Sequence, residues 1–290
     1  MSDPIRLVVC GLGGIGSWAA DAGGRILNVN APGSQLLLVD GDSFEPKNVS
    51  RQNFTTYGNK AKSVAKDLIE KLPNVIILAK PAWIVDKAEV DKEVEEDESA
   101  GYISAEQLLK EGDVVFMCFD NHAARKLVLD AAENIDNITI INGGNEDDGF
   151  GCTYTYVRRN GIDVTDHPRN HYEEFINPPD KNPGEMSCAE RAELEGGSQV
   201  IATNLCVAST MVFDFHRLMF ADDASEIEED KSNYAAVVMT NDKMFDLGYG
   251  TSVSRARCSE DVLAEMSDLN PDVAEVCHGR VVSLDEEITV

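Results

Sequence analysis

Short apolar runs alternate with stretches of helical spacing through the first half of the chain. The predicted strands are 5–10, 35–40, 75–80, 113–118 and 137–141, and the predicted helices are 15–28, 60–71, 103–111 and 121–134. Alternation of this kind favours parallel strands joined by helices that cover both faces of the sheet. We therefore expect an α/β fold with a Rossmann-like, doubly wound, mostly parallel sheet in which all five strands are buried.

The second half of the chain departs from this alternation. Residues 152–158 and 234–239 are predicted to add antiparallel strands, and 198–220 has the pattern of a helix. Between them, 161–197 is rich in Pro, Asn, Asp and Gly, which is typical of a long irregular connection. We expect a single domain over 1–290, with a nucleotide-binding half (1–158), a crossover loop (159–197) and a C-terminal helix with added strands (198–290).

The charge balance restricts the partners. Acidic residues number 52 against 25 basic ones, a formal net charge of −27. This composition opposes binding to nucleic acid or to an anionic membrane, and no apolar run reaches the ~18–20 residues of a membrane span. The seven cysteines are scattered and form no C-x-x-C pair. We therefore expect no structural zinc and a reducing, cytoplasmic location.

A glycine-rich motif, GLGGIGS, occupies 11–17 between the first predicted strand and the first predicted helix. Glycines let backbone N–H groups approach a phosphate closely, and the start of a helix favours an anion. Asp40 ends the second strand, where an acid can hold a ribose. Alone, this pattern fits a dinucleotide site or tight strand–helix packing. Its candidate ligand-binding glycines are Gly11, Gly13, Gly14 and Gly16.

The residues after Asp40 change this interpretation. The run DGDSFEPKNVSRQNFTTYGNKAK brings several groups that can face phosphates, and Asp120 follows the fourth strand, where a carboxylate can hold Mg²⁺. A nucleoside triphosphate requires such charge neutralisation, whereas a dehydrogenase does not. The candidates in this run are Asp42, Asn48, Arg51, Gln52 and Lys60.

These motifs together resemble the ThiF/MoeB/ubiquitin-activating-enzyme adenylyltransferases, with the plasmid- and phage-associated ThiF branch as the most similar. The resemblance covers roughly 5–158 and, more weakly, 186–220. It depends on GLGGIGS, LLLVDGDSFEPKNVSRQ, the lysine that follows and VVFMCFDNHAAR. It implies ATP and Mg²⁺ as cofactors. The implied roles are ribose binding by Asp40, phosphate contacts by Asn48, Arg51 and Lys60, and Mg²⁺ positioning by Asp120, with Gln52 in the same motif and Lys60 chosen over Lys62.

The resemblance also implies a reaction. A ubiquitin-like protein ending in glycine is adenylated on its C-terminal carboxylate, and a homodimer is the expected assembly. Cys188 lies in the crossover loop shortly before a predicted helix and is the candidate for a thioester that passes the protein to a conjugating enzyme. An incidental cysteine is the alternative. Cys10, Cys118 and Cys206 are interpreted as packing residues.

Other functions remain open at this point. They are a sulfur-carrier-protein adenylyltransferase, a non-catalytic scaffold subunit of a heterodimeric activator, and a NAD-dependent oxidoreductase. His122 and His167 are interpreted as surface or loop histidines rather than catalytic bases. Trp18 and Trp83 are interpreted as packing groups.

Overall fold

The computed structural model of the chain describes residues 2–90, 100–145, 149–186, 190, 200–220, 241–246, 251–255 and 282–283. Two predictions made from the sequence, the strand at 234–239 and the role of Cys188, lie outside the described residues.

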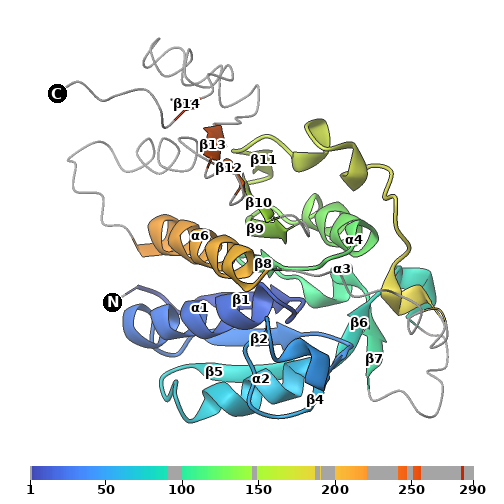
Figure 1. Cartoon of the computed structure of the whole chain (residues 1–290). Coiled ribbons are helices and arrows are strands. Elements are labelled where there is room, and N and C mark those ends of the chain that lie inside the picture. The colour runs from blue at the N-terminus through green and yellow to red at the C-terminus, as the bar shows by residue number, and fades with distance from the viewer. Residues whose placement is uncertain are drawn as a thin grey trace.

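A mixed β-sheet forms the centre of the molecule (Figure 1). Its parallel part has the strand order β5-β2-β1-β8-β9, and antiparallel strands continue it from β9 through β10, β12, β13 and β14. The predicted α/β, doubly wound sheet with antiparallel additions is confirmed. The parallel strands are β1 (Arg6–Cys10), β2 (Gln35–Val39), β5 (Ile76–Lys80), β8 (Val114–Met117) and β9 (Ile138–Asn145). The antiparallel strands are β10 (Phe150–Arg159), β11 (Ile162–Asp163), β12 (Asp242–Asp246), β13 (Thr251–Arg255) and β14 (Val282–Ser283).

Helices cover both faces of the sheet. Because side chains alternate along a strand, Leu7 and Val9 of β1 enter one core, whereas Val8 and Cys10 enter the other. The first core is closed by α1 (Gly16–Asn30), α2 (Lys60–Ile69) and α6 (Ile201–Phe220), and the second by α3 (Ala105–Leu108) and α4 (His122–Ala132). Short strand pairs lie beside the sheet: β3 (Ser43–Phe44) with β4 (Gly58–Asn59), and β6 (Ala82–Ile84) with β7 (Gly101–Ile103).

Two predictions about these elements were wrong. The strand predicted at 75–80 is not buried, because β5 is the last strand of the path and exposes Ile76 by 52% and Leu78 by 43%. The helix predicted at 103–111 is reduced to Ala105–Leu108, because Leu109 adopts extended backbone and Gly112 has a φ of +80°. No helix among the described residues is long and apolar enough to cross a membrane.

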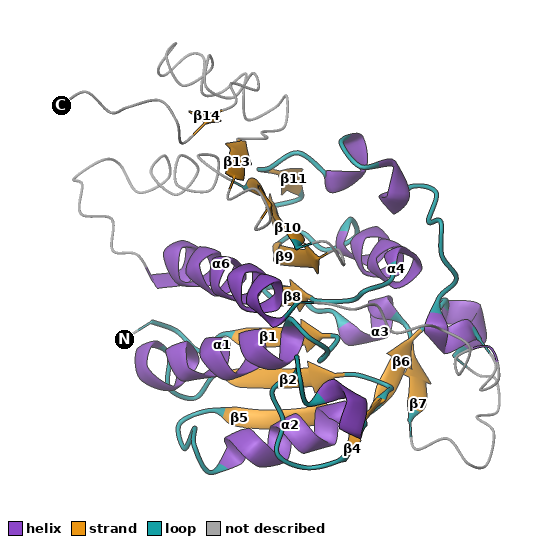
Figure 2. Cartoon of the chain, in the orientation of Figure 1, coloured by secondary structure: helices purple, strands orange, loops and turns teal. Residues whose placement is uncertain are grey.

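The described part of the crossover, up to Met186, is irregular as predicted and runs along the α4 face of the sheet (Figure 2). It contains only β11 and three short 3₁₀ turns, η3 (Pro168–Asn170), η4 (Glu173–Phe175) and η5 (Pro183–Glu185). Phe175 enters the core next to α4, so the segment is packed against the sheet rather than extended into solvent.

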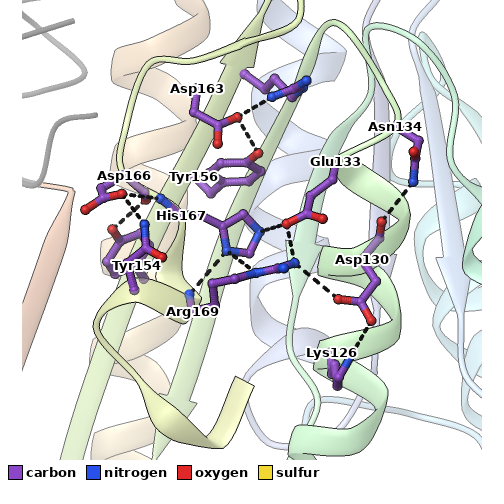
Figure 3. Close-up of polar contacts among 12 residues, drawn as sticks. Lys126, Asp130, Glu133, Asn134, Tyr154, Tyr156, Asp163, Asp166, His167 and Arg169 are labelled. Atoms are coloured by element: carbon purple, nitrogen blue, oxygen red, sulfur yellow. Dashed lines mark hydrogen bonds and ion pairs between the residues drawn. The ribbon is translucent and has the colours of Figure 1, made fainter. Parts of the chain in front are cut away.

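A polar cluster fixes the beginning of this crossover to α4 (Figure 3). Arg169 forms ion pairs with Asp130 of α4 and with Glu133, the residue that directly follows this helix. The backbone N–H and the Nε of Arg169 both donate to Nδ1 of His167 at 3.2 Å. The His167 Nε2 lies 3.3 Å from a carboxylate oxygen of Glu133, and the imidazole meets the Tyr156 ring edge-on. The crossover is therefore held by charge as well as by packing.

His167 lies in a loop, as predicted, but it is not a surface residue, because only 5% of it is exposed. Burial, reinforced by the Arg169 guanidinium, lowers the pKa of His167 to about 4. The imidazole is therefore neutral at physiological pH, and its Nδ1 is free to accept the two bonds from Arg169.

Candidate functional site

A cleft of about 440 Å³ opens where β1, β2 and β8 end. The carboxyl ends of neighbouring parallel strands are the usual ligand position in doubly wound sheets. Nearly all the residues predicted from the sequence line this cleft, although they come from three separate parts of the chain, 11–14, 40–60 and 120. They are Gly11, Gly13, Gly14, Asp40, Asp42, Asn48, Arg51, Gln52, Lys60 and Asp120.

The glycine loop links the first strand to α1 through backbone that other residues would not adopt. Gly11 has a φ of +85° and donates from its N–H to the Val39 carbonyl at 2.9 Å. Gly16 does not line the cleft. A Cβ at this position would lie 1.9 Å from the Gly11 carbonyl oxygen, so Gly16 lets the helix begin directly behind the loop. Gly13, Gly14 and Ile15 line the cleft where α1 begins, so the N-terminus of this helix can receive an anion there.

Asp40 ties the end of β2 to the glycine loop. One carboxylate oxygen accepts from the Leu12 N–H at 2.6 Å, and the other accepts from the Asp42 N–H at 2.8 Å. Burial raises the pKa of Asp40, while the charge of Lys60 opposes this rise. The acid therefore shapes the loop in addition to any contact with a ligand.

Lys60 is the buried cation of the cleft, with only 8% exposure. Its Nζ lies 2.6 Å from an Asp42 carboxylate oxygen and 5.9 Å from the centre of the Phe44 ring. Burial alone would lower the pKa of Lys60, but Asp40 and Asp42 outweigh it and the pKa is raised. The ammonium is therefore charged inside the cleft. Lys62 is exposed and does not line it, which agrees with the choice of Lys60.

The residues at 48–52 that were predicted to contact phosphates begin at the last residue of a short 3₁₀ turn, η1 (Pro46–Asn48). Asn48 is 5% exposed, and its Oδ1 accepts from the Glu45 N–H at 2.8 Å. In the part of the chain that the structure describes, the buried Nε of Arg51 and the buried Oε1 of Gln52 have no hydrogen-bond partner. Unpaired buried polar groups are costly, so a polar ligand in the cleft would lower this cost.

Asp120 follows β8, and its exposed side chain lines the cleft. No hydrogen bond or ion pair within the described segments engages its carboxylate, and its charge contributes to raising the pKa of Lys60. The same segments contain no group of three or more residues that could hold a metal ion by themselves. A lone carboxylate suits Mg²⁺, which binds through one or two carboxylates together with substrate phosphates.

The opposite wall of the cleft was not predicted. Trp83 of β6 packs on Gly41, where a Cβ would lie 2.3 Å from the indole ring. Asn182 and Pro183 of the crossover also line the cleft, about a hundred residues later in the chain. The packing predicted for Trp83 is therefore found, but the same side chain borders the site. No local motif marks these residues, because the wall forms only when the crossover folds back.

The buried cysteines near the cleft are unsuited to nucleophilic chemistry. Cys10 and Cys118 lie in the cores, as predicted. Burial raises the pKa of both thiols, to about 12 for Cys118. They are therefore protonated at neutral pH, and a thiol is a weak nucleophile in that form.

The family model described as "ThiF family" matches residues 3–246. No curated protein matched the chain. Among solved structures, E. coli MccB in complex with MccA-N7isoASN has a TM-score of 0.57 and 14% identity over 89% of this chain and 65% of MccB.

Two further structures are similar to the chain. E. coli MccB with ATP has a TM-score of 0.54 and 15% identity over 94% of this chain and 67% of MccB. E. coli tRNA N6-threonylcarbamoyladenosine dehydratase, TcdA, has a TM-score of 0.43 and 17% identity over 72% of this chain and 85% of TcdA. The chain thus spans about two thirds of the length of MccB, and the MccB likeness shows the shared fold. The family match extends over most of the sequence. The chain belongs to the ThiF family.

Proposed function

We propose that the chain is an ATP-dependent adenylyltransferase that activates the C-terminal carboxylate of a ubiquitin-like protein. The observation that carries the proposal is the convergence in one cleft of a glycine loop, the charged Lys60, the unpaired Arg51 Nε and the free Asp120 carboxylate. ATP supplies the anion for the first three groups, and magnesium bound to its phosphates supplies the partner for the fourth.

The first step joins two anions. An oxygen of the substrate carboxylate attacks the α-phosphorus of ATP, the bond from that phosphorus to the bridging oxygen breaks, and pyrophosphate leaves. The products are an acyl-adenylate and pyrophosphate, and no proton is transferred, because a terminal carboxylate is ionised at neutral pH. No general base is therefore required of the cleft.

The chain's own contribution to this step is electrostatic and positional. Lys60, Arg51 and the amides of the glycine loop reduce the repulsion between the carboxylate and the triphosphate. Asp42 holds the Lys60 ammonium in place through the ion pair at 2.6 Å. Asp120 together with the phosphates would hold Mg²⁺, which would supply positive charge to stabilise the departing pyrophosphate.

The fate of the adenylate is a separate part of the proposal. A Cys188 thiolate attacks the acyl carbonyl carbon, and the bond from that carbon to the phosphate oxygen breaks. AMP leaves, and the product is a thioester on Cys188 that can be passed to a conjugating enzyme. In the sulfur-carrier alternative, the adenylate passes to a sulfur donor and Cys188 is not required. Trapping the adduct distinguishes the two, because only the thioester is lost in Cys188→Ala.

Thermal unfolding tests the nucleotide site without any partner. We expect Mg-ATP to raise the midpoint by several degrees and NAD⁺ to leave it unchanged, since a ligand at ~100 times its dissociation constant adds about 2.7 kcal/mol to the native state. Asp120→Ala should reduce the shift. A shift with NAD⁺ alone would contradict the proposal. No shift of the midpoint with either ligand would favour a non-catalytic scaffold subunit.

Exchange of radiolabelled pyrophosphate into ATP then identifies the substrate. Candidate ubiquitin-like proteins should support exchange only with a free C-terminal glycine, and the same proteins without that residue serve as matched controls. Exchange that a short peptide supports equally well would overturn the ubiquitin-like assignment while retaining adenylation.

A further inference from the structure

A carboxylate from the crossover caps the helix that follows Asp120. The Asp180 Oδ2 accepts from the His122 N–H at 2.9 Å, and its Oδ1 accepts from the Ala123 N–H at 3.0 Å. The Asn121 side chain accepts from the next amide of α4, that of Ala124, at 2.9 Å. Three first-turn amides of α4 are thus satisfied, two of them by a residue almost sixty positions away.

The residues next to Asp180 are held just as firmly. Asn121 Nδ2 donates to the Lys181 carbonyl at 2.6 Å, and Asn182 Nδ2 donates to the Ile84 carbonyl of β6 at 2.8 Å. A Cβ on Gly184 would lie 2.8 Å from the Trp83 Cβ, so this segment packs closely on β6. We call Asp180–Gly184 the strap. It joins the turn after β8 to β6 across the cleft.

The strap therefore determines where Asp120 lies. Asp120 directly precedes the residues that Asp180 and Lys181 hold. On its other side, the Arg125 Nε donates to the Phe119 carbonyl at 3.0 Å. The backbone on both sides of Asp120 is fixed in this way, while the described residues leave its carboxylate without a hydrogen bond and open to the cleft.

The cap also has an electrostatic consequence. The N-terminus of a helix attracts anions, and α4 begins at the carboxyl end of β8, next to the glycine loop. In this chain the His122 and Ala123 amides are already bound to the Asp180 carboxylate. A triphosphate is consequently directed away from α4 and toward Lys60 and Arg51.

We propose that Asp180 is a positioning residue of the nucleotide site, which fixes Asp120 for magnesium and closes the α4 N-terminus to phosphate. This inference depends on the proposed function, because it assumes that the cleft binds Mg-ATP. If Asp180 were only a structural cap, its removal would affect folding and would lower the affinity for Mg-ATP and for metal-free ATP by the same factor. A positioning role affects the magnesium complex selectively.

The test measures the affinity for ATP by isothermal titration calorimetry, with Mg²⁺ and with EDTA. In Asp180→Ala we expect the dissociation constant of Mg-ATP to rise about ten-fold, the effect of one capping interaction. The constant for metal-free ATP should stay the same or fall, because a negative charge has been removed and two amides have been freed. Asp180→Asn retains one acceptor oxygen and should give an intermediate rise for Mg-ATP.

Asp67→Ala is the matched control. Asp67 is also half-buried and accepts from a backbone amide, that of Thr55 at 2.8 Å, but it does not line the cleft. We expect this variant to change neither constant. Far-ultraviolet circular dichroism verifies folding, and Asp180→Asn provides the measurement if Asp180→Ala does not fold.

Two results would overturn the inference. One is a rise by the same factor with and without Mg²⁺, and the other is no change in either constant. Failure of the wild-type chain to bind Mg-ATP is a different outcome, because it removes the proposed function itself before any variant is compared.

Discussion

The two walls of the cleft differ in whether their buried polar groups have hydrogen-bond partners. On the wall lined by residues of 11–15 and 40–60, Arg51 Nε and Gln52 Oε1 are buried without partners among the described residues. On the strap wall, both oxygens of Asp180 accept backbone amides, and Asn182 uses its amide nitrogen and its oxygen in hydrogen bonds.

This difference separates binding from support. Polar groups of Asp40, Asn48 and Lys60 on the first wall also have partners, so the difference rests on Arg51 and Gln52. An unpaired polar group gains free energy when a ligand supplies its partner, whereas a satisfied one gains little. Substitutions on the first wall should therefore change ligand affinity more than stability. Substitutions on the strap wall should change stability more than ligand affinity, except at Asp180, whose cap on α4 also positions Asp120.

The largest effect is expected at Lys60. Lys60→Met removes the only buried ammonium among the described residues that line the cleft and leaves Asp42 without its 2.6 Å partner. Mg-ATP affinity, measured by calorimetry, should fall about 100-fold, because hydrogen bonds to charged groups contribute about 1.5–3 kcal/mol. Lys62→Met on the same helix is the control and should bind normally. Equal losses in both variants would contradict the assignment of Lys60.

A smaller effect, on stability rather than on nucleotide affinity, is expected at Asn182, which is 3% exposed. Asn182→Ala leaves the Ile84 carbonyl and the Gly184 N–H unpaired. The free energy of unfolding in urea should fall by about 1–3 kcal/mol, with at most a few-fold change in Mg-ATP affinity. The exposed Asn177→Ala in the same crossover should cost under about 0.5 kcal/mol. A large loss of affinity with unchanged stability would reverse the roles of the two walls.

The polar cluster that fixes the crossover to α4 should make the stability of the protein depend on pH through His167. Burial, and then Arg169, lowers the pKa of His167 to about 4, from 6.5. Because the unfolded chain binds the proton first, the contribution of His167 is fully present above pH ~6.5 and is lost as the pH falls toward ~4. From pH ~7 to ~5.5, the loss of this contribution should lower the free energy of unfolding by about 1 kcal/mol.

His167→Gln provides the measurement. Urea unfolding over the same pH range should show a flatter decline in this variant than in the wild type. The nearby carboxylates of Asp130, Glu133, Asp163 and Asp166 are present in both proteins, so the difference between the two slopes isolates the imidazole. Parallel slopes would show that His167 titrates normally.

The same separation explains what the sequence could predict. The strands and the binding wall are contiguous patterns: apolar runs, spaced glycines, and polar groups shortly after Asp40. Each depends on neighbours along the chain, so periodicity and spacing were sufficient to predict them. Of the two lysines, Lys60 is buried in the cleft and Lys62 is exposed, so the role of Lys60 stays a prediction that its position supports.

The features that the sequence did not predict depend on tertiary contacts. Residues 75–80 have the composition of a buried strand, but burial depends on what covers a strand, and the described strands pair with β5 on only one side. Trp83 and Asn182 meet only after the crossover folds back. His167 gave no local signal of burial. The thioester role of Cys188, which lies outside the described residues, remains a prediction.

The smallest effect is expected at Lys47, which belongs to the binding wall but is exposed. Its Nζ pairs with Glu45 at 2.6 Å, and the two side chains are 69% and 53% exposed. Such pairs contribute about 0–1 kcal/mol and are screened by salt. Lys47→Ala should therefore weaken Mg-ATP binding about two- to three-fold in low salt and hardly at all in high salt. A salt-independent loss as large as that of Lys60→Met would mean that burial does not determine which cations of this wall hold the nucleotide.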